Sequence, residues 1–242
     1  SHAGIDAVPL ETAALGFITD DQHGTAVALL DQCERNMGPT LETALDKGIV
    51  PVVTGFFGIT PEGHVTTVGR SGTDYTAAVI AYSVNAKPIE IWKEVDGFMS
   101  ADPKLVKDAF MIDRLSYEEA AELAYFGAQV LHARAVQPAR QKGIEIVIKN
   151  LYNPESPGTV IGNGRMTRKD VIKSVSYVPK VATLKVYDTG AGYRSGFLAD
   201  ITSCLSQEDV NIFSATTSQT CVAVLIDEQQ IPQAKRAIKG VI

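Results

Sequence analysis

A loop with two glycines that leads into an Ala-rich helix is the most constraining feature of the sequence. It occupies residues 66–78, T-T-V-G-R-S-G-T-D-Y-T-A-A. Gly69 and Gly72 permit backbone angles and close approaches that other residues disfavour, and the polar residues before Tyr75 are types that cap a helix. A helix start collects unpaired N–H groups, and Arg70 adds a planar fork of donors that suits a carboxylate or phosphate. The segment predicts a loop that binds a small anion, with a structural turn as the alternative.

Strand and helix patterns alternate over residues 1–150, which predicts an α/β domain with a largely parallel sheet covered on both faces. Strands are expected at residues 5–8, 16–19, 49–54, 65–68, 88–92 and 144–149, of which 49–54 is expected to be buried and 144–149 to be the last. Helices are expected at residues 25–34, 40–47, 75–84, 116–125 and 129–142. Ser116 and Glu119 predict a capping box, Pro39 is expected at a helix start, and Gly143 is expected to end a helix.

A change in composition predicts a domain boundary. Residues 153–173 are rich in Pro, Gly, Asn, Thr and charged side chains. The segment beyond it has the order βαββα, with strands expected at 181–187, 210–216 and 220–226 and helices at 196–206 and 229–239. We therefore expect two domains, at residues 1–165 and 166–242.

Composition and charge exclude several classes of protein. A net charge of −6 and a pI near 5.3 argue against a nucleic-acid-binding protein, which needs clustered Lys and Arg. Three widely spaced cysteines form no C-x-x-C pair, so neither a disulfide framework nor a metal site is expected. This use of cysteine favours a reducing cytoplasm. The sequence also lacks an apolar run of membrane-spanning length, so no membrane partner is expected.

Three blocks of sequence, at residues 52–74, 89–103 and 115–132, resemble the aspartate kinases of the amino-acid kinase family, and the segment after Lys180 resembles their ACT regulatory module. The resemblance implies an incomplete three-layer αβα kinase domain with a mostly parallel sheet, followed by a ferredoxin-like ACT module. It implies ATP-dependent phosphorylation of L-aspartate to 4-phospho-L-aspartate, the entry to lysine, threonine and methionine biosynthesis. Mg-ATP would be a substrate, with no tightly bound cofactor.

The same resemblance assigns the substrate site. Arg70 would hold the carboxylate of aspartate through two hydrogen bonds, Thr73 would add a third, and Phe56 would form a wall of the pocket. Asp74 would lie at the reacting end as the catalytic residue and would help to organise lysines or the amino group. For Arg70 a surface salt bridge is the alternative, and for Asp74 a helix cap.

The nucleotide site is expected at a second set of positions, several of which depart from the family pattern. They are Lys93, Glu94, Met99, Lys104, Gln129 and Val130. Met99 stands where the family has Tyr, with a core side chain as the alternative, and Lys104 stands where it has Arg. Gln129 replaces a Lys, which predicts lower ATP affinity or a different phosphate contact. His132 is expected to pack or cap a helix and not to act as a base.

In the ACT segment the resemblance implies an amino-acid effector, lysine or threonine, bound at a seam between modules of a homodimer. The expected effector-binding residues are Ser195, Gly196, Phe197, Leu198, Asn211 and Ile212. The helix start at Gly196 supplies backbone N–H groups for a carboxylate. The alternative is a module that only dimerises and so buries an edge strand.

The family's K-F-G-G-T-S turn is not found within residues 1–46. We therefore expect the chain as given to be inactive on its own, as part of a longer enzyme. One alternative is a non-catalytic, amino-acid-sensing protein built on a kinase-derived scaffold. Another is a different amino-acid kinase, for acetylglutamate or glutamate, which the ACT segment disfavours.

Overall fold

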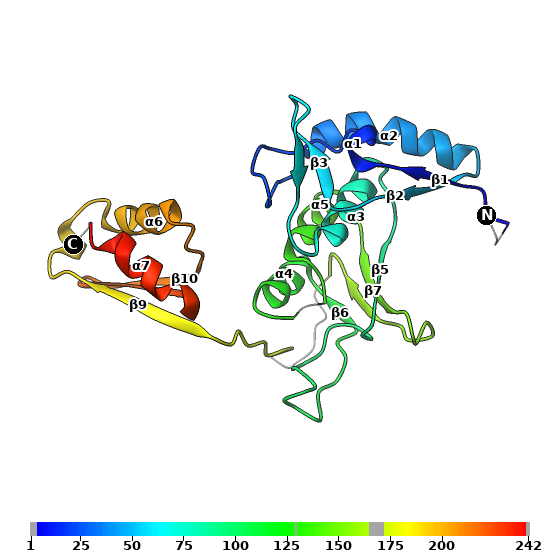
Figure 1. Ribbon diagram of the computed structural model, residues 1–242. Helices are drawn as coiled ribbons and strands as arrows, with labels where there is room; N and C mark the ends of the chain where they lie inside the picture. The colour runs from blue at the N-terminus through cyan, green and yellow to red at the C-terminus, as the bar shows by residue number, and fades with distance from the viewer. Residues whose placement is uncertain (1–3, 129, 165–171, 241–242) are drawn as a thin grey trace. The chain divides into compact units, whose positions relative to one another are not determined.

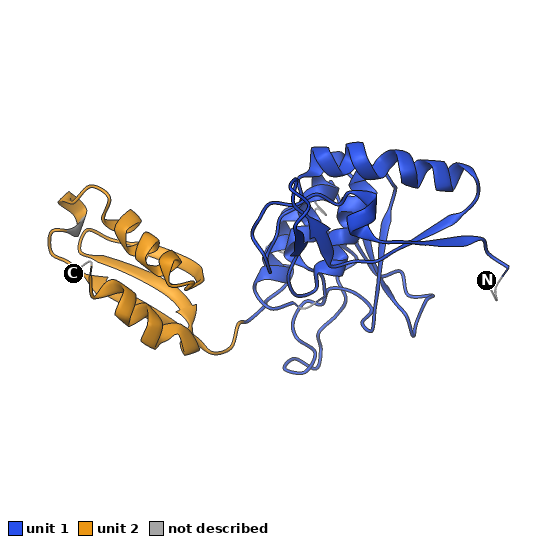
Figure 2. Ribbon diagram, turned by 45° about the horizontal axis from the view of Figure 1, so that its top comes forward, with its two compact units in different colours: residues 1–177 blue, residues 178–242 orange. Residues whose placement is uncertain are grey.

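The computed structural model describes residues 4–128, 130–164 and 172–240, and its chain divides into two compact units. They comprise residues 1–177 and 178–242 (Figure 2). The division lies beyond the expected boundary at residue 165, because the intervening segment bonds back to the first unit. Val175 donates its N–H to the carbonyl of Ser100 at 2.9 Å, and Lys173 pairs with Glu119 at 2.7 Å. In the described residues no helix is both long and apolar enough to cross a membrane.

The first half of unit 1 contains two small sheets and two longer helices (Figure 1). In chain order its elements are β1 (Ala7–Leu10), α1 (Thr12–Leu15), α2 (Leu30–Asp46), β2 (Val50–Val53), β3 (Phe57–Ile59), β4 (Val65–Thr67) and α3 (Gly72–Ser83). β1 and β2 pair in parallel, and β3 and β4 form an antiparallel hairpin. α2 packs on α3, and their contact encloses a core that includes Phe17, Met37 and Val79.

The second half of unit 1 is built on a four-stranded mixed sheet of order β5-β7-β8-β6. Its elements are β5 (Ile89–Lys93), β6 (Arg114–Leu115), α4 (Tyr117–Tyr125), the 3-10 helix η1 (Ala133–Ala135), α5 (Val136–Lys142), β7 (Ile146–Asn150) and β8 (Thr159–Ile161). β5 runs parallel to β7 and β6 to β8, whereas β7 and β8 are antiparallel. The capping box of Ser116 and Glu119 and the left-handed Gly143 after α5 are both confirmed.

Several expected elements were wrong. One continuous helix, α2, replaces the two expected helices and contains Pro39, because buried residues on both sides of the proline, Met37 and Leu41, hold it against the core. β2 is not fully buried, since Val50 and Val52 point to solvent. α1 was not predicted. Residues 16–19 form only isolated bridges where a strand was expected. Residues 130–132, expected to lie in the helix at 129–142, precede the helical segment that begins at Ala133.

β8 is the most informative omission, because it lies within the segment expected to hold the domain boundary. Its Thr159 is fully buried, and its hydroxyl donates to the carbonyl of Ile112 at 2.7 Å and accepts from the N–H of Phe98 at 2.8 Å. A polar residue can occupy a core strand when its hydrogen bonds are satisfied internally. β7 is therefore not the last strand of the unit.

Unit 2 has the expected βαββα order. Its elements are β9 (Val181–Tyr187), η2 (Ala191–Tyr193), α6 (Phe197–Gln207), β10 (Ile212–Thr217), β11 (Cys221–Asp227), η3 (Glu228–Gln230) and α7 (Ile231–Ile238). The antiparallel sheet has the order β10-β11-β9. Alternate residues of β11, including Val224 and Ile226, are buried with Ile201 and Leu205 of α6. The expected α/β fold class with a smaller second unit of βαββα order is confirmed.

Candidate functional site

The loop before α3 is shaped by close packing as well as by backbone conformation. Gly69 has a φ of 89°, as the glycine pattern predicted, and Ser71 also lies in the left-handed region with a φ of 56°. At position 72 a glycine is needed because there is no room for a side chain: a Cβ on Gly72 would lie 2.3 Å from Cγ2 of Val68. The expected side-chain cap is absent: α3 begins at Gly72, and Ser71 makes no capping hydrogen bond.

A second loop packs against this helix start and carries Phe56. Phe56 has a φ of 81°, which is uncommon for a bulky residue, and its N–H donates to the hydroxyl of Thr76 at 3.2 Å. A Cβ on Gly55 would lie 2.9 Å from Cγ2 of Thr73, so the two loops are in close contact. The structure thus brings Phe56 and Thr73 together at the start of α3.

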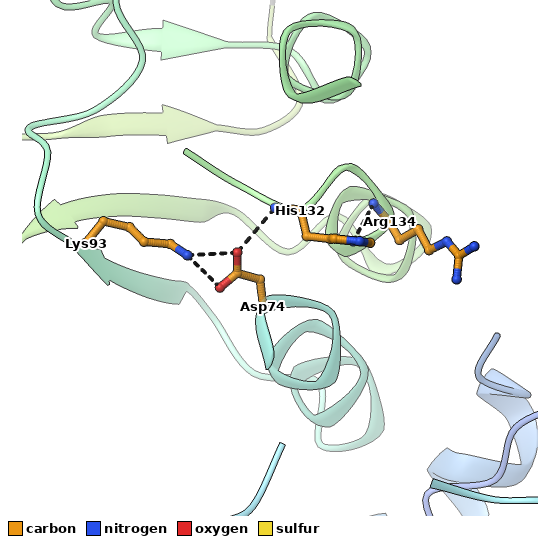
Figure 3. A network of polar contacts seen from close by, with 4 residues as sticks. All are labelled: Asp74, Lys93, His132 and Arg134. Atoms are coloured by element: carbon orange, nitrogen blue, oxygen red, sulfur yellow. Dashed lines mark hydrogen bonds and ion pairs between the residues drawn. The ribbon is translucent and has the colours of Figure 1, made fainter. Parts of the chain in front are cut away.

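Asp74, in the first turn of α3, is the centre of a polar network (Figure 3). Its side chain is only 8% exposed, and Nζ of Lys93, at the end of β5, lies 3.0 Å from both of its carboxylate oxygens. The backbone N–H of His132 donates to Oδ2 at 3.2 Å. One buried carboxylate therefore joins α3, β5 and the turn before η1.

The network continues from His132 to the loop that precedes α2. Nδ1 of His132 accepts from the N–H of Arg134 and caps η1, which confirms the capping role predicted for this residue. The guanidinium of Arg134 donates to the carbonyl of Thr25 at 2.7 Å. Burial lowers the pKa of His132, the charge of Arg134 lowers it further, and the carboxylate of Asp74 opposes both effects.

Arg70 and Thr73 lie on the surface beside this buried centre. Both side chains are exposed, and among the described residues Arg70 has no hydrogen bond or ion pair. The alternative of a surface salt bridge for Arg70 is thus not seen in the part of the chain that the structure describes. A guanidinium without a protein partner can accept a ligand carboxylate without first losing an intramolecular bond.

The residues expected at the nucleotide site differ in their exposure. Glu94 and Lys104 are exposed, while Met99 is half-buried and bridges to Met111. Val130 is half-buried and packs on the core cluster, whereas Gln129 lies outside the described residues. No hydrogen bond or ion pair that the structure records for described residues connects Lys93 to the others.

Unit 2 contains an open pocket of about 580 Å³ at the start of α6. It is lined by Arg194, Gly196, Phe197, Leu198, Ala199, Thr202, Thr217, Ser218 and Val222. Three of the six expected effector residues belong to this lining, whereas Ser195, Asn211 and Ile212 do not. Arg194 and the end of β10 were missed, although a cation next to the Gly196 helix start is a signal that could have identified Arg194.

Arg194 is held at the pocket by local contacts. Its guanidinium pairs with Asp200 at 2.9 Å and lies 5.6 Å from the ring centre of Phe197.

In the described residues, no group of three or more His, Cys, Asp or Glu side chains could hold a metal ion. The three cysteines are free thiols, and burial raises the pKa of Cys33 to about 11.

Comparison with known proteins gives consistent matches for both regions. The profile of the amino acid kinase family matches residues 1–150, and that of an ACT domain matches residues 176–239. The chain is 34% identical over 229 residues to the chloroplastic aspartokinase 1 of Arabidopsis thaliana, covering 94% of this chain and 40% of the relative. It is 31% identical over 209 residues to the lysine-sensitive aspartokinase 3 of Escherichia coli, covering 86% and 46%.

The structural comparison agrees. The crystal structure of E. coli aspartokinase III in complex with aspartate and ADP, in the R-state, matches with a TM-score of 0.79 at 28% identity. The match covers 93% of this chain and 50% of that chain, so the chain spans about half the length of its relatives or less. The chain belongs to the amino acid kinase family, carries an ACT domain after the kinase region, and is similar to aspartokinases over both.

Proposed function

We propose that the protein containing this chain is an aspartate kinase, which transfers the γ-phosphoryl group of Mg-ATP to the side-chain carboxylate of L-aspartate. The products are 4-phospho-L-aspartate and ADP. This reaction is the first step toward lysine, threonine and methionine. The observation that carries the proposal is the buried Asp74, bound to Lys93 at the carboxyl end of a parallel strand and adjacent to the exposed Thr73. The similarity to an aspartokinase that binds aspartate and ADP supports it.

Each substrate residue has a distinct task in this proposal. Arg70 binds the α-carboxylate of aspartate through its planar guanidinium, and Thr73 adds a hydrogen bond. Phe56 forms a wall of the substrate site. Asp74 holds the positively charged ammonium of Lys93 at the reacting end. Such a charge is useful there because phosphoryl transfer depends on positioning and on neutralising the transferring group.

The ACT unit adds regulation to the proposal. The pocket at the start of α6 combines Arg194 and the N-terminal end of a helix, which suit a carboxylate, with the apolar Leu198 and Val222 for a side chain. We propose that it binds an amino-acid effector, lysine or threonine, in a cytoplasmic homodimer that pairs through its ACT units.

The test is an assay of the full-length protein with L-aspartate, Mg-ATP and hydroxylamine, which traps acyl phosphate as a hydroxamate. Aspartate-dependent hydroxamate is expected, and its absence, with an amino acid still bound by calorimetry, would favour the non-catalytic sensing protein. For the ACT pocket, Ala199→Tyr should abolish inhibition by the effector and preserve activity. Ser203→Tyr, on an exposed position of α6 that does not line the pocket, is the matched control.

A further inference from the structure

The positions predicted for the substrate site and for the nucleotide site meet at one ion pair, Asp74 with Lys93. We propose that Lys93 is a catalytic residue that contacts the transferring phosphoryl group, and that Asp74 is the positioning residue that aims it. This proposal rests on the proposed function. It moves Lys93 from the nucleotide's periphery to the junction at which the two substrates react.

The geometry of the pair favours a ligand on the lysine side. The Asp74 side chain is 8% exposed and the Lys93 side chain is 30% exposed, so the ammonium reaches toward solvent while the carboxylate lies behind it. An ammonium has three N–H donors. Two of these point to the oxygens of Asp74, which leaves the third for a ligand.

The place of Lys93 in the fold supports the same assignment. It is the last residue of β5, which pairs in parallel with β7. In open α/β sheets ligands bind beyond the carboxyl ends of parallel strands. The start of α3 lies against this end, because Asp74 in its first turn binds Lys93 directly.

Three other cations of unit 1 are engaged elsewhere, and Arg70, which has no partner among the described residues, is assigned to the α-carboxylate of aspartate in the proposed function. The guanidinium of Arg134 donates to the carbonyl of Thr25, Lys142 pairs with Glu34, and Arg114 pairs with Glu145. Position 129 is Gln and carries no charge. Among the residues that the structure describes, Lys93 therefore supplies the positive charge beside Asp74.

Asp74 itself is poorly suited to act as a base. Its two oxygens already accept from Lys93 and from the N–H of His132. In the proposed step, the bond between the γ-phosphorus and the bridging oxygen of ATP breaks, and a bond to a carboxylate oxygen of aspartate forms. ADP leaves with the bond's electron pair, and Lys93 keeps its proton while it neutralises charge on the phosphoryl oxygens.

The experiment uses the full-length protein and four variants: Lys93→Met, Lys93→Arg, Asp74→Asn and the double variant Asp74→Asn/Lys93→Met. Lys93→Met should lower kcat by about 100- to 1000-fold, the usual effect of removing one donor to developing charge, with a smaller change in KM for aspartate. Lys93→Arg should recover part of the loss. Lys107→Met, at an exposed lysine, is the control and should match the wild type.

The double variant separates chemistry from folding, because it removes the carboxylate that Lys93→Met leaves without its cation. If Asp74 acts through Lys93, kcat of the double variant should lie within about threefold of Lys93→Met, since residues acting as a unit are non-additive. A folded Lys93→Met or double variant that keeps kcat within about threefold of the wild type overturns the proposal.

Failure of the proposed function can be told apart from failure of this inference. If the wild type forms no aspartyl hydroxamate, the aspartate kinase proposal fails, and binding of Mg-ADP and of inorganic phosphate by calorimetry decides the role of Lys93. A loss of about tenfold or more in phosphate affinity in the double variant supports a phosphate contact, as expected when a charged donor is lost. Unchanged affinity for both ligands overturns it.

Discussion

The hydroxyl oxygen of Tyr75, in the first turns of α3, accepts a hydrogen bond from the backbone N–H of Ala28 at 2.9 Å in the buried interior. This bond connects α3 to the segment that precedes α2. Ala28 is 6% exposed and Tyr75 is 2% exposed, so water cannot replace the phenol easily.

Tyr75→Phe should therefore lower the free energy of unfolding by about 1–3 kcal/mol, because it leaves a buried N–H group without an acceptor. Urea denaturation measures the change. Tyr152→Phe, at a side chain that is 78% exposed, should change stability by less than about 0.5 kcal/mol. Equal effects of the two variants would show that the Tyr75 hydrogen bond contributes nothing to stability.

Gly72 provides a steric test of the loop before α3. Its φ is not in the left-handed region, and the constraint on it is the 2.3 Å that would separate a new Cβ from Cγ2 of Val68. Gly72→Ala should cost about 1–3 kcal/mol of stability through overpacking. Val68→Ala should destabilise the Gly72→Ala variant less than it destabilises the wild type. A double-mutant cycle by thermal or urea denaturation measures this difference, and strictly additive effects would contradict the packing account.

Arg70 should matter for the substrate and not for stability. Arg70→Met removes an exposed guanidinium that has no intramolecular partner among the described residues, so the free energy of unfolding should change by less than about 0.5 kcal/mol. The KM for aspartate should rise about 10- to 100-fold, the equivalent of a charged hydrogen-bonding pair. Arg140→Met, which removes an exposed pair with Glu118, is the matched control and should leave KM unchanged. If Arg70→Met, Arg140→Met and the wild type have the same KM for aspartate, Arg70 does not belong to the substrate site.

His132 predicts a dependence of stability on pH. Its folded pKa lies below the ordinary 6.5, chiefly because of burial, so as the pH falls below that value the unfolded chain binds a proton before the folded one does. Stability should thus fall between about pH 7.5 and about pH 5.5. His132→Asn keeps a capping acceptor for η1 but cannot titrate, so the fall should be smaller, as urea midpoints across this range will show. His64→Asn, at an exposed site, is the control; equal slopes for all three proteins would contradict the assignment.

Features set by local sequence were predictable. The strand at residues 181–187 has the expected limits, and the capping box of Ser116 and Glu119 forms as expected, because short-range alternation and side-chain capping need no distant partner. The positive φ values of Gly69 and Gly143 also follow from local chain geometry.

Features set by tertiary contacts were not predictable. Pro39 favours a helix start locally, yet buried neighbours on both sides hold it inside α2. β8 was hidden by a linker-like composition, since the bonds that satisfy Thr159 come from residues far away in sequence. The pairing of Asp74 with Lys93 likewise joins two motifs that the sequence shows only as separate segments.

The carboxylate of Asp74 is already hydrogen-bonded by groups from two other segments, a strand end and a turn. A substrate that binds beside it meets dipoles that are preorganised, so little reorientation is needed there when charge develops. Altering any one of the three segments would be expected to shift the other two, so that substitutions distant in sequence behave as changes to a single centre.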